Sequence, residues 1–285
     1  MSRFPSEWLA LREPVDKTSR NPKVLNACRK AFENSGALKI CDLGAGTGAS
    51  VRAFAHLLPA QQRWTLVDHD AQNLKHALDV LARWGEVPRP KNNTIELEHR
   101  GQHMEVETLE YDLTTSAAPW SPNTELVTAS ALLDLTSSNW ITRTVNALLE
   151  NRTPLLATLN FDGQLKAAPA HALDDSIFNA FRDHQRTDKG FGAAAGPDAP
   201  NTLEGALIKA GYVVTSGASP WCMTTDTQKL MHETLKGISN AAKEIGALSE
   251  GKINDWLNDR LLNIDTLTVG HRDIFAMPGP KLASD

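Results

Sequence analysis

The sequence predicts an α/β protein with a doubly wound, mostly parallel sheet, and two observations lead to that prediction. Short apolar runs alternate with helical patterns over residues 37–162. A glycine-rich turn, Gly44-Ala45-Gly46-Thr47-Gly48, directly follows the first of these runs and leads into a helical stretch. Strands that alternate with helices need crossover connections, which make neighbouring strands parallel and place helices on both faces of the sheet.

The elements follow in order along the chain. Helical patterns are expected over residues 8–32 (interrupted near Pro14 and Pro22), 49–58, 70–84, 137–150, 174–184, 202–210, 225–247 and 252–262. Within 70–84, for example, the apolar residues recur at helical spacing. Extended segments are expected over residues 37–41, 62–67, 92–99, 104–111, 126–131, 154–161, 212–215 and 266–276.

The alternation of strands and helices changes after Gly163, where polar, irregular and then glycine-rich sequence follows. Long loops of this kind inside a domain are often lids or binding loops. We therefore expect one domain over residues 1–285. Its core would consist of residues 37–162, 201–219 and 264–278, and a helical and loop cap would consist of residues 1–30, 164–200 and 220–262.

Bulk composition restricts the function classes. The formal net charge is −5 and no Lys/Arg cluster stands out, which argues against a nucleic-acid partner and for a small-molecule substrate. The three cysteines are widely separated, and no apolar run approaches the length of a membrane span. We expect a cytoplasmic protein without a membrane segment or a required metal, and the oligomeric state stays open.

Three carboxylates fall at the ends of expected strands. Asp42, Asp68 and Asp112 each end an extended segment, so a parallel sheet would bring them to one edge, where ligands of α/β proteins bind. The glycine turn lets bare backbone approach a nucleotide or nucleoside. A carboxylate at this edge can accept hydrogen bonds from both ribose hydroxyls or from an amino group.

These motifs resemble those of the class I S-adenosylmethionine-dependent methyltransferases. Residues 40–48, Ile-Cys-Asp-Leu-Gly-Ala-Gly-Thr-Gly, are similar to the family's first motif. Leu66-Val67-Asp68 and Tyr111-Asp112-Leu113 are similar to its two later acidic motifs, and residues 126–133 to the segment beside the methionine part of the cofactor. The resemblance covers residues 37–162 and 266–276, and it implies a seven-stranded, Rossmann-like sheet with an antiparallel last strand.

The resemblance also implies a binding site for S-adenosyl-L-methionine. In that site Asp42 would orient the amino group, Asp68 would hold the ribose and Asp112 the adenine edge. His69, which directly follows Asp68, would stack near the adenine or point to solvent rather than act in catalysis. The complete expected set is Asp42, Gly44, Ala45, Gly46, Gly48, Asp68, His69, Asp112, Leu113 and Ser130.

Two residues are candidates for catalysis. Asp134 follows the strand at 126–131 and would act as a base or orient the substrate, although it could instead cap the helix that begins near Ser137. His184 begins His-Gln-Arg-Thr-Asp-Lys-Gly-Phe-Gly, residues 184–192, which would form a lid or a merely solvated loop.

Four more residues are candidates for substrate binding: Arg12, Trp140, Arg186 and Lys189. Arg12, Asp16 and Arg20 recur every four residues and would share one helix face, which either closes over the ligand or is exposed and salt-bridged. Arg186 and Lys189 suit an anionic group.

The predicted function is methyl transfer from S-adenosylmethionine to an oxygen or nitrogen of a small metabolite. Two alternatives stay open. Residues 44–49 also satisfy a loose G-x-G-x-x-G/A pattern, and Asp68 follows Gly48 by 20 residues (68 − 48), so an NAD(P)-dependent oxidoreductase is possible in principle. The second alternative is a non-catalytic protein that binds S-adenosylmethionine.

Overall fold

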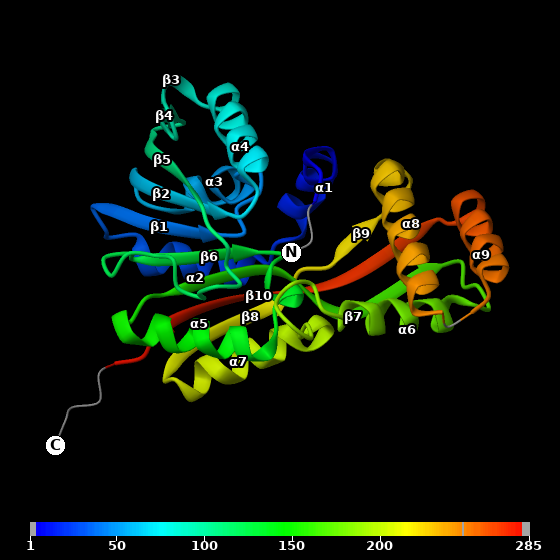
Figure 1. Ribbon diagram of the computed structural model, residues 1–285. Helices are drawn as coiled ribbons and strands as arrows, with labels where there is room; N and C mark the ends of the chain where they lie inside the picture. The colour runs from blue at the N-terminus through cyan, green and yellow to red at the C-terminus, as the bar shows by residue number, and fades with distance from the viewer. Residues whose placement is uncertain (1–3, 247, 281–285) are drawn as a thin grey trace.

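The structure of the chain, a computed structural model, describes residues 4–246 and 248–280. Residues 1–3 of the first expected cap segment lie outside the described residues. The described strands form one ten-stranded sheet in the order β3-β4-β5-β2-β1-β6-β7-β10-β8, with β9 paired to β10 (Figure 1). Their bounds are β1 (Ala37–Leu43), β2 (Gln61–Asp68), β3 (Glu86–Lys91), β4 (Thr94–His99), β5 (Gln102–Glu110), β6 (Leu126–Ser130), β7 (Leu155–Ala168), β8 (Tyr212–Ala218), β9 (Trp221–Met223) and β10 (Thr266–Pro278).

The predicted fold class is confirmed. The strands β5-β2-β1-β6-β7 pair in parallel, and β10 is inserted antiparallel between β7 and β8. These seven strands are the expected core sheet. The hairpin β3–β4 extends one edge of this core sheet. The short β9 pairs with the N-terminal part of β10, at Leu267–Val269. The sequence did not indicate β3, because it contains Pro88 and Pro90 and all its residues are exposed at the sheet edge.

Helices cover both faces of the sheet. The alternation along β1 shows this: Leu38 and Ile40 pack into the core under α2, α3 and α4, whereas Cys41 and Leu43 pack into the core under α5 and α7. A parallel strand with both faces buried reads as a nearly continuous apolar run, as this one does. The helices are α1 (Ser6–Ser19), α2 (Pro22–Phe32), α3 (Ala49–Phe54), α4 (Ala71–Trp84), α5 (Ser138–Asn151), α6 (Asp174–Gln185), α7 (Ala199–Lys209), α8 (Gln228–Ile245) and α9 (Glu250–Asn263).

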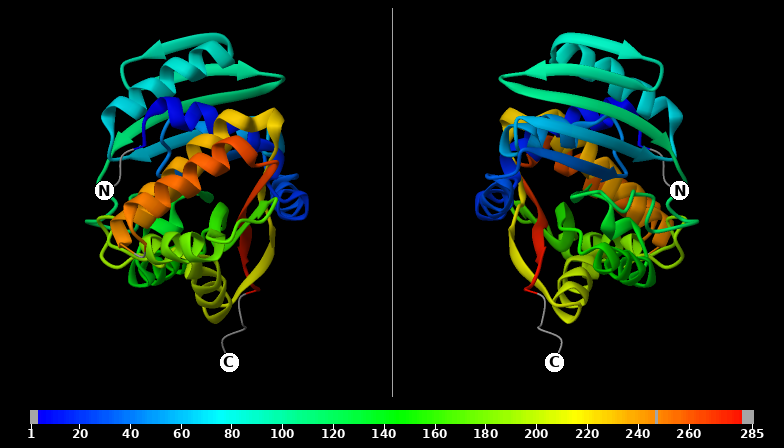
Figure 2. Two further views of the ribbon diagram at one scale, coloured as in Figure 1. Left: turned by 90° about the vertical axis from the view of Figure 1, so that its right-hand side faces the viewer. Right: turned by 90° about the vertical axis from the view of Figure 1, so that its left-hand side faces the viewer.

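A second lobe grows out of the sheet, and we call it the extension. The strand expected over residues 154–161 continues through Gly163 to Ala168 and stays paired with β10. Helices α6, α8 and α9 pack on this two-stranded arm, as Figure 1 and the left view of Figure 2 show. The extension has its own apolar core, around Trp256 and Phe178. A buried ion pair between Asp174 and Arg260 joins α6 to α9.

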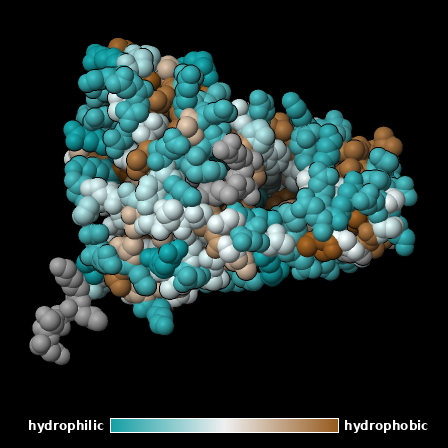
Figure 3. Space-filling view, in the orientation of Figure 1, coloured by the Kyte–Doolittle hydropathy of each residue, from teal (hydrophilic) through white to brown (hydrophobic). Residues whose placement is uncertain are grey.

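The first helix lies between the core and the extension. α1 continues through Pro14 as one helix, and it contacts both β9 and α8. It therefore places its buried side chains beside the carboxyl edge of the sheet. The face of the molecule seen in Figure 3 is largely hydrophilic, and no described helix has the length and apolar character needed to cross a membrane.

Candidate functional site

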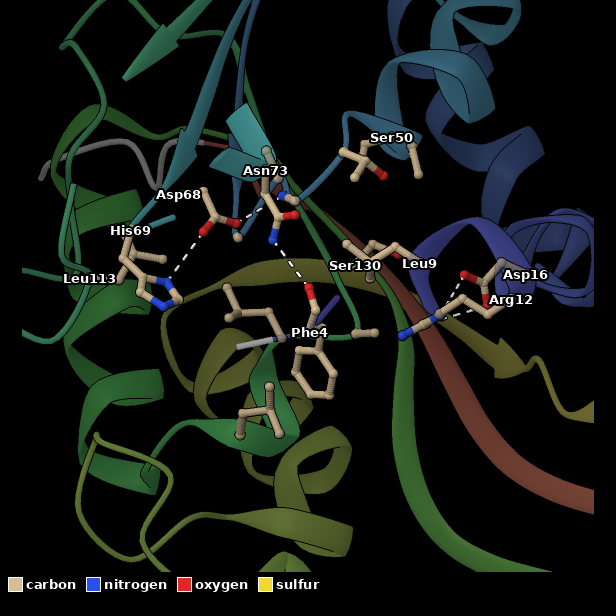
Figure 4. A pocket seen from close by; sticks show the side chains of 18 of the residues that line it. Phe4, Leu9, Arg12, Asp16, Ser50, Asp68, His69, Asn73, Leu113 and Ser130 are labelled. Carbon is tan, nitrogen blue, oxygen red and sulfur yellow. Dashed lines mark hydrogen bonds and ion pairs between the residues drawn. The ribbon is translucent and has the colours of Figure 1, made fainter. Parts of the chain in front are cut away.

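A pocket opens at the carboxyl edge of β1, β2 and β6, which is where ligands of α/β proteins bind. Figure 4 shows Asp68 and His69 at one end of it and Arg12 with Asp16 at the other. Its lining comes from α1, the glycine turn, the ends of β2 and β6 and the loop after α6: Phe4, Leu9, Arg12, Asp16, Arg20, Gly44–Thr47, Ala49, Ser50, Asp68, His69, Asn73, Leu113, Ser130–Leu132, Leu135, Lys189 and Phe191.

The glycine turn forms part of the pocket floor. Gly44 and Gly46 have φ values of +65° and +52°, and a Cβ at Gly44 would lie 3.1 Å from a Leu132 methyl carbon. Both positions therefore need glycine. Gly48 lies outside the pocket lining; it has a φ of +71°, and a Cβ there would meet Ala77 on α4 and Leu66 on β2, so glycine at this position also allows close packing of the turn against α4.

Asp68 is a buried acid at the end of β2. Its carboxylate accepts hydrogen bonds from the backbone N–H groups of Gly46 (2.8 Å) and Asp70 (2.9 Å). The Nδ1 atom of His69 lies 3.2 Å from the same carboxylate, while Nε2 of His69 is buried with no partner among the described residues. A carboxylate has about four lone-pair sites, so Asp68 keeps capacity for ligand hydroxyl groups.

Asp42 lies one layer beneath the pocket lining, at the end of β1. Thr128 on β6 donates a 2.6 Å hydrogen bond to Oδ1, while Oδ2 is buried without a partner in the described part of the chain. Burial raises the pKa of Asp42 to about 7, against the lowering effect of its hydrogen bond with Thr128. An unpaired buried carboxylate oxygen is costly unless a ligand completes it.

α1 contributes three polar side chains from one face, as the four-residue spacing predicted. Nε of Arg12 donates to Asp16 over 2.8 Å, and Asp16 also accepts from Trp221 Nε1. Asp16 and Arg20 are only 5% and 7% exposed, so this face is not the exposed salt-bridged surface that the sequence also allowed. Arg20 completes this face. The signal for it in the sequence was the four-residue spacing of Arg12, Asp16 and Arg20.

The turn after β6 is strained where it meets the pocket. Ala131 has φ +51°, a region that residues with a side chain rarely adopt, and it lies between Ser130 and Leu132 in the lining. Backbone strain of this kind tends to occur at functional sites. Asp134 follows in a short 3-10 helix, with its Oδ1 atom buried and unpartnered among the described residues. Burial raises the pKa of Asp134 to about 6, and the nearby Arg12 charge opposes this shift.

Some side chains of the loop after α6 line the pocket, and others form ion pairs outside it. Lys189 and Phe191 line the pocket, and burial lowers the pKa of Lys189. His184 lies outside the lining, with Nε2 2.9 Å from a Glu244 carboxylate oxygen on α8. Arg186 also lies outside it, in an ion pair with Asp198. The structure therefore brings Lys189 to the site, but neither His184 nor Arg186.

Two further expected residues support the pocket from outside. Trp140 is fully buried: its Nε1 atom donates to the Leu113 carbonyl over 2.7 Å, and its ring packs edge-on against Phe191. It holds two lining residues and does not itself face the pocket. Asp112 is exposed, and its interactions with the Thr114 side chain and then with the Thr114 backbone N–H hold its pKa below the usual value; its neighbour Leu113 lines the pocket.

β10 carries two buried polar side chains, His271 and Asp273, which the sequence analysis did not assign to the site. Bulges interrupt its pairing with β7 on either side of His271 and Arg272. Asp273 accepts from the Asn21 and Leu159 backbone N–H groups, which fastens β10 to the end of α1. Burial and the Arg12 charge lower the pKa of His271 to about 3, so this imidazole is neutral.

Among residues 4–246 and 248–280, no three His, Cys, Asp or Glu side chains are grouped as metal ligands would be. None of the protein-family models or curated protein sequences compared with the chain matches it.

Solved structures do match. A putative methyltransferase from Bacillus halodurans aligns with a TM-score of 0.50 at 12% identity, over 90% of this chain and 98% of that one. The YcgJ protein from Bacillus subtilis gives 0.49 at 12%, over 90% and 98%. A SAM-dependent methyltransferase from Thiobacillus denitrificans, in complex with S-adenosyl-L-homocysteine, gives 0.44 at 14%, over 98% and 100%. The chain is thus similar in fold to the putative Bacillus halodurans methyltransferase.

Proposed function

We propose that this chain is an S-adenosylmethionine-dependent methyltransferase that acts on an oxygen or nitrogen of a small molecule. The observation that carries the proposal is that two buried, charged side chains beside one pocket each have a polar atom available to bind a ligand. Asp42 Oδ2 and Arg20 Nε are buried and unpartnered in the described residues, and they lie beside a turn that a Cβ at Gly44 would crowd. A donor with a ribose and an amino-acid end fits this arrangement.

Each part of the donor has a candidate partner. Asp68 would accept hydrogen bonds from the ribose hydroxyl groups, and the backbone of Gly44, Ala45 and Gly46 would pass beneath it. His69 and Leu113 would flank the adenine, with Asp112 at its outer edge. Asp42 would receive the ammonium group directly or through water.

Methyl transfer to oxygen or nitrogen requires alignment, exclusion of water and removal of one proton. When bound, S-adenosylmethionine supplies an electrophilic methyl group, which passes to the acceptor as the bond to sulfur breaks. Asp134 would take the proton of the acceptor, because it lies between the lining residues Leu132 and Leu135 and its pKa of about 6 leaves it ionised at neutral pH.

The acceptor would bind at the end of the pocket away from Asp68. Leu132, Leu135 and Phe191 add apolar surface to the pocket lining, and Arg12 and Lys189 add positive charge to it. Arg12 is already paired with Asp16, whereas the contacts of Lys189 within the described residues are with the Thr187 hydroxyl and the His184 ring. An apolar acceptor with an anionic substituent therefore fits this end best.

Calorimetry tests the donor assignment first. S-adenosylhomocysteine should bind with a micromolar or lower Kd, and NAD should not compete with it. Turnover of a panel of small hydroxyl and amino compounds, followed by release of S-adenosylhomocysteine, would then separate an enzyme from a non-catalytic binding protein. Binding of NAD without binding of S-adenosylhomocysteine would overturn the proposal in favour of an oxidoreductase.

A further inference from the structure

Arg20 is a buried cation with hydrogen-bonding capacity to spare. It is the C-cap residue of α1, it is 7% exposed and it lines the pocket. One terminal nitrogen donates weakly to Ser130 Oγ over 3.4 Å, and Nε has no partner in the described part of the chain. Within the described ranges, no carboxylate lies within 4.0 Å of its guanidinium. A buried guanidinium in this state lacks the anion that such a group normally accompanies.

Apart from the long bond to Ser130, Arg20 is held in place by a ring contact and by nearby charge. The guanidinium lies over the Phe54 ring at 5.1 Å from the centroid, which is a cation–π distance. Asp16 and Asp273 both lie near enough to stabilise the positive charge. Their oxygens accept from other groups: Asp16 accepts from Arg12 and Trp221, and Asp273 accepts from the Asn21 N–H, the Leu159 N–H and the Ser219 hydroxyl. Arg20 is thereby held in place and left open toward the pocket.

Arg20 and Asp42 need binding partners of opposite kinds. Asp42 Oδ2 needs a hydrogen-bond donor, and Arg20 Nε needs an acceptor. The two charges are close enough that Arg20 lowers the pKa of Asp42. An ammonium and a carboxylate on one carbon atom would satisfy both residues together, and the amino-acid end of the donor has this chemistry.

We propose that Arg20 binds the α-carboxylate of the methyl donor and makes the site selective for donors that carry a complete amino acid. This inference rests on the proposed function. Charge-assisted bonds between a guanidinium and a carboxylate are the strong, directional class of hydrogen bond. Asp68 and Arg20 then hold the two ends of the donor.

Calorimetry with truncated ligands tests the assignment. The probes are S-adenosylhomocysteine and 5′-methylthioadenosine, which keeps the adenosine and the thioether sulfur but has no amino acid. Arg20→Met should weaken S-adenosylhomocysteine about 10- to 100-fold, as expected for loss of hydrogen bonds to a charged group, and should change 5′-methylthioadenosine by less than about twofold. Arg20→Lys should give an intermediate loss.

A matched control is Arg272→Met, which removes a positive charge next to Asp273 but outside the pocket lining. It should leave both affinities unchanged. Equal weakening of both probes by Arg20→Met, or no weakening of either, would overturn the inference. If the unsubstituted chain binds neither probe, the proposed function itself fails, which is a distinguishable outcome.

A second measurement needs no substitution, in case Arg20→Met does not fold. S-adenosylmethionine and its decarboxylated form differ only in the carboxylate. The unsubstituted chain should bind the decarboxylated form about 10-fold or more weakly, and Arg20→Lys should reduce that ratio. Equal affinities for the two donors would contradict the role of Arg20.

Discussion

Gly46 donates its backbone N–H to the Asp68 carboxylate over 2.8 Å, so the acidic end of β2 and the glycine turn after β1 form one unit. This bond orients the carboxylate that we assign to the ribose. Since the two partners come from adjacent parallel strands, the unit depends on the register of the sheet, in which Asp42 pairs with Leu66.

Asp68→Asn tests the ribose assignment. The amide replaces one accepting oxygen with a donor, so it cannot accept from Gly46 and from both ribose hydroxyl groups together. We expect the Kd for S-adenosylhomocysteine to rise about 10- to 100-fold by calorimetry. The matched control is Asp79→Asn on the exposed side of α4, which should have no effect. An unchanged affinity in Asp68→Asn would remove Asp68 from the site.

Asp42→Asn tests the buried carboxylate through stability. The pKa of Asp42 is about 7 in the folded chain, against an ordinary value of 3.8. Between these values the folded chain binds more protons than the unfolded chain, so the Asp42 contribution to the free energy of unfolding falls as pH rises. The variant lacks this titration and should become more stable than the unsubstituted chain above pH 7, by about 1–4 kcal/mol.

Urea unfolding at pH 5 and pH 8 measures this effect. The advantage of Asp42→Asn should be larger at pH 8 and should shrink toward pH 4. The same variant should bind S-adenosylmethionine more weakly, because the amide offers no charge to the ammonium group. A stability difference that does not change with pH would contradict the ionisation assigned to Asp42.

Asp134→Asn tests the proposed base. Because burial raises the pKa of Asp134 to about 6, kcat/KM should fall on the acid side of pH 6 and level off above it. Replacement by an amide should lower kcat by about 10²- to 10⁴-fold and remove the acid limb. The measurement is a pH profile with an acceptor identified by turnover. If the variant keeps the acid limb, another group takes the proton.

Lys189→Met and His184→Gln separate the two roles of the loop after α6. Lys189 lines the pocket, whereas His184 pairs with Glu244 on the extension. We expect Lys189→Met to raise KM for an anionic acceptor about 10-fold without changing donor affinity, since one charge-assisted contact is lost. His184→Gln should change KM by less than about twofold on the same reasoning. Equal damage by the two substitutions would restore His184 to the site.

The donor half of the site could be predicted from sequence because its signals are local. The turn at Gly44 and Gly46 needs positive φ within a few residues of a strand end, and Asp68 ends an apolar run. Strand ends on a parallel sheet meet at one edge, so these residues come together once the fold class is known. Gly48 lies outside the pocket lining, and local sequence does not separate a glycine needed for packing from one needed for ligand approach, because both demand glycine.

The acceptor half could not be predicted, because distant pairings decide it. Whether Arg186 or Lys189 turns into the pocket depends on Asp198, which pairs with Arg186 only in the folded chain. Arg20 is buried because α1 is fastened to β10 through Asp273, a contact between residues more than 250 positions apart. Local sequence patterns do not carry this information.

The most direct test of the donor site is a crystal structure with S-adenosylhomocysteine. The ribose should lie against Asp68, and the amino-acid end should lie between Asp42 and Arg20, with its sulfur facing the Leu132 and Lys189 side of the pocket. Density for the ligand at any other place, or with the amino-acid end away from Arg20, would contradict the account given for this site.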